Sequence, residues 1–406
     1  MSSPFSVLAE ALRALAARPT DHGAWLTMAA ALAAQGLSEE AERAFSIVGL
    51  SGLRGGQVAL AVACGRLLAQ RGNVRGPELL EEIAATYCQG SGLTSEAAPP
   101  APHGEPLELP ALTPDAEPEQ VAATVRAALD LLEPKVTAAG PGKLPAAPLL
   151  SSLPLSGARA LIGVMTARTA QAGERLVVAG EPATSLFWLA YGAAAVSRDD
   201  VTLGELHGGA FFGEIALVGG TTRTAQVTAR TDVWLLEIPA RAVEAAAHKH
   251  PQLATVLASH AKARLLSNVM RTSELFLELE ADERATLLGK FSIEIVEANT
   301  QFITEGQPNA HLWVVVAGRC EVRSEGAEMA TLGPGAAVGE ISLVSGKPAV
   351  ADVLTAERTV LLRLARADFQ EVVARHPGLL ERVEDLVVTR EEANRALFHD
   401  AGDLLV

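Results

Sequence analysis

The sequence predicts an α+β protein of several domains: a helical N-terminal region, a proline-rich linker and two tandem β-rolls with flanking helices. Three observations lead to this prediction. Residues 1–92 are rich in Ala and Leu at helical spacing, and 11 of the 22 prolines lie between Pro99 and Pro148. From residue 149 onward the chain repeats itself at an offset of 126 residues, which indicates two copies of one domain.

The N-terminal region, residues 1–92, is expected to form paired helices. Its best-defined pattern resembles a tetratricopeptide repeat, in which small residues let two helices approach while large residues fill the gap between them. The residues that follow this spacing are Trp25, Met28, Ala29, Leu32, Gly36, Ala41 and Phe45. The resemblance implies a groove for a partner peptide, and a plain helical bundle is the alternative.

Residues 93–148 are expected to be an extended or disordered linker, because proline at this density removes backbone donors and blocks helix formation. One stretch inside the linker, Pro118 to Leu132, has the pattern of a short amphipathic helix with acidic residues near its start. The sequence leaves open whether this helix is a docking element or a transient turn.

The two repeated domains are expected at residues 149–272 and 273–406, the second ending in a helical tail from Leu379 to Leu397. No insertion is needed to keep the two copies in register. The matched positions are Gly180 with Gly306, Gly192 with Gly318, Gly213 with Gly339, Glu214 with Glu340, and His250-Pro251 with His376-Pro377.

Each copy is predicted to be a small β-roll built from short strands with glycine turns. Alternating apolar residues at 186, 188 and 190, and at 312, 314 and 316, indicate half-buried strands. A strand at 233–238 is followed by a helix from Ala240 to His248, which Pro251 interrupts before a longer helix continues toward Met270.

Composition narrows the function. A net charge of −15 argues against nucleic acid and anionic membranes as partners. The three cysteines are widely spaced, and we expect reduced thiols in a cytoplasmic protein without a signal peptide or membrane span. The histidines are scattered, so no metal site is expected, and no phosphate loop, nucleophile elbow or kinase motif appears. We therefore expect a protein that is not an enzyme and needs no cofactor.

A ligand site is predicted where a glycine, a carboxylate and an arginine fall within twelve residues. Arg223 can hold a phosphate with two charge-assisted hydrogen bonds, and Glu214 can accept a hydrogen bond from a sugar hydroxyl. The stretch resembles the phosphate-binding cassette of cyclic nucleotide-binding domains, in which the glutamate holds the ribose 2′-hydroxyl and the arginine pairs with the cyclic phosphate. The resemblance implies that cAMP or cGMP binds at Phe212, Gly213, Glu214, Ile215, Ala216, Arg223, Thr224 and Ala225. Thr224 resembles the threonine of members that accept cGMP; an ion pair between Glu214 and Arg223 with no ligand is the alternative.

The second copy departs from this pattern at its arginine position. Ala349 stands where Arg223 stands in the first copy, Asp352 adds a negative charge nearby, and Lys347 lies two residues too early. Without the arginine, the phosphate of a bound nucleotide would be buried unpaired beside Glu340. We therefore expect a degenerate site that serves as a packing or partner surface or takes a different ligand; its residues are Gly339, Glu340, Ile341, Ser342 and Ala349.

Two functions follow from these expectations. The first is a non-catalytic signalling or adaptor protein that binds cAMP or cGMP in the first roll and relays the signal to a protein partner held by the N-terminal helices or the second roll. The second is a scaffold that uses the rolls and helices for protein contacts without a nucleotide. The sequence leaves open whether the chain forms homo-oligomers.

Overall fold

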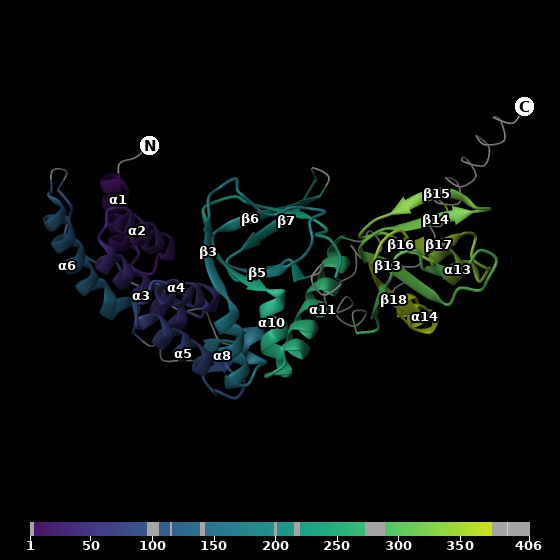
Figure 1. Cartoon of the computed structure of the whole chain (residues 1–406), viewed down its shortest axis with the longest axis horizontal. Coiled ribbons are helices and arrows are strands. Elements are labelled where there is room, and N and C mark those ends of the chain that lie inside the picture. The colour runs from purple at the N-terminus through teal and green to yellow at the C-terminus, as the bar shows by residue number, and fades with distance from the viewer. Residues whose placement is uncertain are drawn as a thin grey trace, which may run out of the picture.

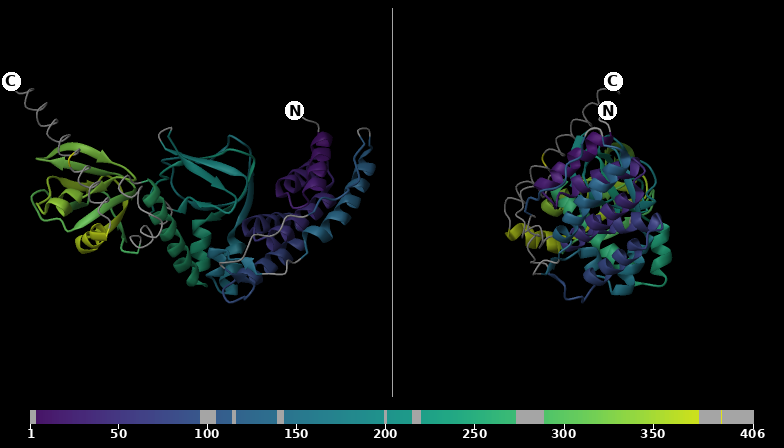
Figure 2. Two further views of the ribbon diagram at one scale, coloured as in Figure 1. Left: turned by 180° about the vertical axis from the view of Figure 1, so that it is seen from behind. Right: turned by 90° about the vertical axis from the view of Figure 1, so that its left-hand side faces the viewer.

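The structure is a computed structural model that describes residues 4–95, 105–113, 116–138, 143–198, 201–214, 220–272, 289–375 and 388. An array of helices forms one end of the chain, the first roll lies in the middle, and the second roll lies at the other end (Figure 1). The view from behind shows the same order along the long axis (Figure 2).

The N-terminal region forms consecutive helices connected by short turns. Each of α2 to α5 is followed by a glycine with positive φ, at Gly36, Gly56, Gly72 and Gly90, because a left-handed residue ends a helix at low cost when it has no Cβ. The helices are α1 (Pro4–Ala17), α2 (His22–Ala34), α3 (Ser38–Arg54), α4 (Val58–Gln70) and α5 (Arg75–Tyr87).

The predicted helix pair is present as α2 and α3. Six of the residues that follow the repeat spacing are at most 1% exposed: Trp25, Met28, Ala29, Leu32, Ala41 and Phe45. Two adjacent buried helices are compatible with either a repeat or a bundle, so the tetratricopeptide character stays a prediction.

Within the linker, the helix suggested at Pro118–Leu132 is present and packed, so this part is not the extended or disordered spacer expected of the segment as a whole. Residues 118–136 form helix α6 (Pro118–Val136), whose apolar face is buried in the N-terminal core. Ion pairs from Arg43 to Asp130 and Glu133, both at 2.7 Å, attach α6 to α3. Pro118 lies at the first turn, where its missing N–H costs nothing, and Pro134 lies in the last turn, three residues before the C-cap of the helix at Thr137.

The linker ends in short elements that join the helices to the first roll. Strand β1 (Thr94–Ser95) pairs in parallel with β2 (Leu144–Pro145), and helices α7 (Pro148–Ser151) and α8 (Leu155–Val164) follow. Leu149, Leu150, Leu161 and Ile162 from α7 and α8 are buried in a core that also contains residues of α4 and α5. The N-terminal helices and the first roll therefore share one hydrophobic core.

The first roll consists of two four-stranded antiparallel sheets with the orders β3-β10-β5-β8 and β4-β9-β6-β7. Its strands are β3 (Thr166–Ala170), β4 (Arg175–Val177), β5 (Ser185–Tyr191), β6 (Ala193–Arg198), β7 (Val201–His207), β8 (Phe211–Phe212), β9 (Gln226–Ala229) and β10 (Val233–Pro239).

The second roll repeats this architecture with the orders β11-β18-β13-β16 and β12-β17-β14-β15. Its strands are β11 (Ser292–Val296), β12 (Gln301–Ile303), β13 (His311–Ala317), β14 (Cys320–Ser324), β15 (Ala327–Leu332), β16 (Ala337–Val338), β17 (Asp352–Thr355) and β18 (Thr359–Ala365). Six strands of one roll match their counterparts residue for residue at an offset of 126, which confirms the repeat predicted from the sequence.

The central strands are buried on both faces, not half-buried as the alternation suggested. On β5, Leu186 and Trp188 belong to the core shared with the helices, whereas Phe187 and Leu189 face the interior of the roll. Strand β13 is likewise buried along almost its whole length. A strand that separates a roll interior from a helical layer has apolar residues on both faces, so alternation cannot reveal its burial.

Helices α10 (Ala240–Ala247) and α11 (Gln252–Thr272) follow the first roll and lie beside it (Figure 1). The interruption at Pro251 between them confirms the predicted break. In the second roll the short helix α13 (Glu340–Ser345) lies between β16 and β17, and α14 (Arg366–Arg375) follows β18. The motif His376-Pro377 and, apart from Val388, the predicted tail at 379–397 lie outside the described residues. Within the described chain, no helix is both long and apolar enough to cross a membrane.

Candidate ligand-binding sites in the two rolls

The first cassette, residues 212–225, begins where β8 ends beside β5. Phe212 pairs with Phe187 across the two strands, and their rings stack with centroids 5.2 Å apart. Gly213 follows with φ of 85°, a conformation that residues with a Cβ rarely adopt, and an added Cβ would lie 2.6 Å from Arg223 Nη1. The glycine therefore provides both the turn and the space for the arginine.

Arg223 is 7% exposed and holds the cassette through backbone carbonyls. Its Nη1 donates to Gly213 O at 2.8 Å and its Nη2 donates to Ser185 O at 2.6 Å. The guanidinium carbon lies 5.7 Å from the centre of the Phe187 ring. The structure thus brings Phe212 and Gly213 together around the buried guanidinium of Arg223, as the sequence predicted.

The electrostatics of Arg223 favour an anionic partner. Burial lowers the pKa of its guanidinium from the usual value, because a charge is unfavourable away from water, and the negative charges of Glu214, Glu237 and Glu181 act in the opposite direction. Both recorded hydrogen bonds of the side chain go to neutral carbonyls. A phosphate reaching this position would replace neutral acceptors with charged ones.

The other predicted residues of the first site lie around this arginine. Glu214 is 5% exposed and lines a cavity of about 190 Å³ between the roll and helices α10 and α11, together with Phe211 and His260. Thr224 and Ala225 are half-buried and lead into β9, and Arg198 donates to Thr224 O at 3.0 Å. Ile215 and Ala216 lie outside the described residues.

The second cassette, residues 338–351, matches the described parts of the first at its glycine and at its arginine position, where it has a different side chain. Gly339 has φ of 90°, and Ala349 makes the backbone hydrogen bonds that Arg223 makes, at the matching positions. Gly306 N donates to Ala349 O at 2.8 Å, and Ala349 N donates to Gln307 O at 2.9 Å. In the first roll, Gly180 N donates to Arg223 O and Arg223 N donates to Glu181 O in the same way. At this position the second roll therefore keeps the backbone contacts and lacks the guanidinium.

Asn309 replaces the hydrogen bonds that the arginine makes in the first roll. Its Nδ2 donates to Gly339 O at 3.1 Å and to His311 O at 2.7 Å. These carbonyls are the counterparts of Gly213 O and Ser185 O at an offset of 126. An uncharged amide thus occupies the role of the cation, and an added Cβ at Gly339 would lie 2.5 Å from Asn309 Nδ2.

Arg366 adds a second attachment that the first roll lacks. Its Nη2 donates to Asn309 O at 2.8 Å and to Ser342 O at 3.0 Å, which joins Asn309 to the short helix α13. Alanines occupy the positions of Asn309, Ser342 and Arg366 in the first roll. The sequence analysis did not identify Asn309 or Arg366. When the two repeats are aligned, each is a polar residue at a position where the first copy has an alanine, and this difference could have identified them.

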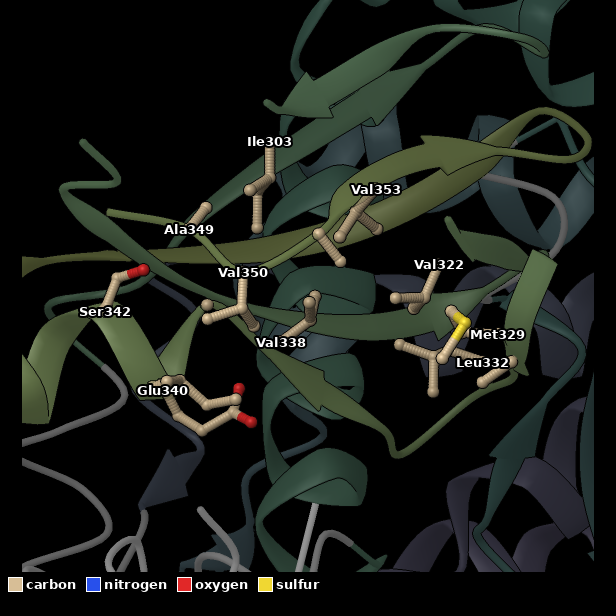
Figure 3. Close-up of a pocket in the computed structure, with 14 residues that line it drawn as sticks. Ile303, Val322, Met329, Leu332, Val338, Glu340, Ser342, Ala349, Val350 and Val353 are labelled. Carbon is tan, nitrogen blue, oxygen red and sulfur yellow. The ribbon is translucent and has the colours of Figure 1, made fainter. Parts of the chain in front are cut away.

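The second cassette also borders a cavity of about 200 Å³. Aliphatic side chains from β12, β14, β15, β16 and β17 face this space, and Glu340 and Ser342 on α13 lie at its edge (Figure 3). Of the described residues that line it, Glu340 alone is charged. The cavity is lined by all five predicted residues of the degenerate site, which are Gly339, Glu340, Ile341, Ser342 and Ala349.

The other charges near the second cassette do not supply a cation. Lys347 is exposed and is not among the residues that line the cavity. Asp352, the first residue of β17, is negative, and its Oδ1 accepts hydrogen bonds from Gln301 Nε2 and Glu305 N, both at 2.7 Å. Among the residues that the structure describes, no three His, Cys, Asp or Glu side chains gather where they could hold a metal ion.

Comparison with known proteins agrees with this geometry. The model of the cyclic nucleotide-binding domain matches residues 167–250 and again residues 293–376. A cGMP-dependent protein kinase, egl-4, of Caenorhabditis briggsae is 26% identical over 242 residues, which are 56% of this chain and 31% of the kinase. A cAMP-dependent protein kinase regulatory subunit of Yarrowia lipolytica is 23% identical over 230 residues, 55% of this chain and 58% of the subunit. The chain therefore spans less than two thirds of either relative.

Among solved structures, the regulatory domain of Toxoplasma gondii PKA with cAMP is 20% identical, with a TM-score of 0.29 over 60% of this chain and 92% of that one. At that score the overall superposition is poor, so the assignment depends on the two family matches and the repeated cassettes. Residues 167–250 and 293–376 are two tandem cyclic nucleotide-binding domains.

Proposed function

We propose that this chain is a non-catalytic signalling or adaptor protein of the cytoplasm that binds cAMP or cGMP in the first roll and passes the signal to a protein partner. The two domains and the regulatory relatives support a role in cyclic-nucleotide-responsive regulation. The partner would contact the N-terminal helices or the second roll, which are the parts that the ligand does not occupy.

The buried guanidinium of Arg223 is the observation that carries this proposal. It lies among backbone carbonyls, is 7% exposed, and sits at the family's phosphate position beside Glu214. Burying a cation costs free energy unless negative charge lies nearby; Glu214, Glu237 and Glu181 supply part of it, and a cyclic phosphate would add a direct charged acceptor. A charge-assisted hydrogen bond contributes about 1.5–3 kcal/mol net, so a bidentate contact separates measurable from undetectable binding.

The contacts beneath the cassette provide a route for the signal. The ring of Phe211 on β8 lies 5.0 Å from that of His260 on α11, edge to face. Phe211 and Glu214 line a cavity whose other side is formed by α10 and α11. If the phosphate draws Arg223 away from Gly213 O, the cassette and this cavity change shape together, and α11 transmits the change toward the second roll. The ligand must favour one arrangement over the other for switching to occur.

The alternative is a ligand-independent scaffold in which Arg223 serves only to hold the cassette backbone. Its two hydrogen bonds to carbonyls are consistent with that role. The scaffold does not explain why a cation is used where Asn309 holds the matching carbonyls in the second roll without a charge.

The test is calorimetric titration of the full chain with cAMP and with cGMP. The full chain is needed because a fragment that begins at residue 149 would expose the core shared with α4 and α5. We expect one ligand per chain, with binding lost in Arg223→Ala and weakened in Arg223→Lys, which keeps the charge but not the planar fork.

Arg230→Ala is the matched control, because Arg230 is exposed and lies outside the cassette. Its affinity should equal that of the wild type. A folded wild-type chain that binds neither nucleotide, or an Arg223→Ala variant that binds as tightly as the wild type, would leave the scaffold as the function.

A further inference from the structure

The two rolls contact each other at the end of the first cassette. Arg198, the last residue of β6, donates from Nε to Thr224 O at 3.0 Å and from Nη1 to Pro334 O at 3.1 Å. Thr224 belongs to the first cassette, and Pro334 lies in the turn between β15 and β16 of the second roll. One guanidinium therefore binds the cassette backbone and the second roll together.

A second contact between the rolls lies four residues earlier in the same cassette. An added Cβ at Gly220 would lie 3.2 Å from Cζ of Arg358, so the Arg358 guanidinium lies directly against the cassette backbone. Arg358 is in the turn between β17 and β18, and its Nε lies 3.6 Å from Glu297 Oε1 within the second roll. The second roll thus presents two of its turns to residues 220–224 of the first.

We propose that Arg198 is a positioning residue that couples nucleotide binding in the first roll to the contact between the rolls, and that this contact opposes binding. The inference rests on the proposed function, because it takes Arg223 as the phosphate ligand. It names the second roll as the part that responds to the nucleotide, through a connection separate from α11.

The residues that make this contact differ between the two copies of the domain. At the offset of 126, Ser324 stands in the second roll where Arg198 stands in the first, and its Oγ donates to Glu305 within its own roll. Asp232 stands in the first roll where Arg358 stands in the second, and it lines a cavity between that roll and the α3–α4 turn. The common domain therefore does not supply the contact, and both arginines occur only where the two rolls meet.

The position of Thr224 links the contact to the ligand. Thr224 follows Arg223 directly, and Arg198 holds its carbonyl while Arg223 holds its own two carbonyl acceptors. Under the proposed function a phosphate replaces those two acceptors, so Arg223 moves toward it and the adjoining backbone moves as well. The planar fork of Arg198 cannot follow Thr224 O without losing Pro334 O. The contact between the rolls and the phosphate therefore compete.

This competition predicts a change in affinity opposite to the one that charge alone predicts. By linkage, a contact that the nucleotide weakens must weaken nucleotide binding by the same factor, so removing Arg198 should raise the affinity. Removing a cation near an anion site would lower the affinity if only charge mattered. A rise in affinity therefore identifies the released contact.

The experiment titrates the full chain with cAMP and with cGMP by calorimetry. Arg198→Ala should raise the affinity for the nucleotide that binds about 5-fold, the lower end of typical coupling between sites. Arg198→Lys keeps the charge but not the fork, so its affinity should also rise. Arg358→Ala, which leaves the first roll intact, should raise the affinity by a smaller factor, and it decides the matter if Arg198→Ala does not fold.

Arg168→Ala is the matched control for these variants. Arg168 is an arginine of the same roll, and its Nη2 donates to Glu174 within that roll. The control should bind the nucleotide as the wild type does. A rise in affinity in this control as large as in Arg198→Ala would show that the effect is not specific to the contact and would overturn the inference.

Spin labels report the contact between the rolls directly. Glu205→Cys on β7 and Glu328→Cys on β15 place one label on each roll at exposed positions, and the three native cysteines are buried. Double electron–electron resonance on the full chain then measures the distance between the labels. The nucleotide should lengthen or broaden this distance when Arg198 is present. In Arg198→Ala the distance should be broad without nucleotide and should change little when nucleotide is added.

The outcomes separate this inference from the proposed function. A wild-type chain that binds neither nucleotide would overturn the proposed function, and the inference with it. Normal wild-type binding together with no tighter binding in Arg198→Ala would overturn the inference alone. A label distance that neither the nucleotide nor Arg198→Ala changes would overturn it as well.

Discussion

The two rolls share a backbone and differ in how the cassette is held. In the first roll a buried cation, Arg223, donates to two carbonyls, which under the proposed function it exchanges for a phosphate. In the second roll the neutral amide of Asn309 donates to the matching carbonyls, and Arg366 ties Asn309 to α13. Both rolls therefore bind the same pair of backbone carbonyls with a side-chain donor, a cation in the first and a neutral amide in the second.

This comparison also explains the positions of the alanines. Ala183, Ala216 and Ala240 in the first roll become Asn309, Ser342 and Arg366 in the second, while Arg223 becomes Ala349. The same two carbonyl positions are thus bound by a donor from a different part of the chain. The second cassette is held by Asn309 and Arg366, which lie outside it, whereas the first is held by Arg223 within it, the residue to which the proposed function assigns the phosphate.

The largest expected effect comes from converting the second roll into a copy of the first. In an Arg223→Ala background, Asn309→Ala with Ala349→Arg should restore a cation beside the carbonyls of Gly339 and His311. Because the backbone of Ala349 already has the register of Arg223, we expect cAMP or cGMP affinity at the second roll to rise about 10- to 100-fold, the value of one charged contact. Calorimetry of the full chain measures it.

The single change Ala349→Arg is the informative control for this conversion. With Asn309 still bonded to both carbonyls, the new guanidinium lacks its resting partners, and the gain should be smaller. If the folded double variant gains no affinity, the missing arginine is not what separates the two sites.

A second prediction concerns the stability of the second roll alone. Asn309→Ala leaves Gly339 O and His311 O without their side-chain donor, which should lower the free energy of unfolding of this roll by about 1–3 kcal/mol. Cys320 provides the readout, because burial raises the pKa of its thiol to about 12 and the group reacts only when the roll opens. Its rate of labelling by a maleimide should rise about 5- to 100-fold.

Cys64 serves as the internal control for this labelling. It is buried in the N-terminal core, and burial raises its pKa as well. Its rate should stay unchanged in Asn309→Ala, with both sites quantified by mass spectrometry. An equal increase in the labelling rates of Cys320 and Cys64 would mean that the chain unfolds as one unit. An unchanged labelling rate of Cys320 would show that Asn309 does not stabilise the second roll.

Much of this comparison could be predicted from the sequence. The offset of 126 and the exchange of Arg223 for Ala349 are local matches, and the structure reproduces the repeat strand by strand. The helix break at Pro251 could also be predicted, because a proline interrupts a helix through its own missing N–H and its ring, without any distant contact.

What escaped the sequence depends on contacts between distant residues. Asn309 and Gly339 are 30 residues apart, and Arg366 reaches Asn309 over 57. The packing of α6 depends on Arg43, 90 residues before Glu133, so proline content alone misjudged the linker. Burial of both faces of β5 depends in the same way on helices that only the tertiary structure places against it.

The smallest expected effect concerns the choice between cAMP and cGMP. Thr224 follows Arg223 directly and is half-buried, and its hydroxyl can hydrogen-bond a guanine group that adenine lacks. Thr224→Ala should lower cGMP affinity about 5-fold, the worth of one neutral hydrogen bond, and leave cAMP affinity unchanged. Arg198 binds the backbone oxygen of residue 224, so the substitution preserves that contact. Val350→Ala, at the matching position of the second roll, is the control and should change neither affinity. An equal loss of cAMP and cGMP affinity in Thr224→Ala would show that the threonine stabilises the cassette and does not recognise the base.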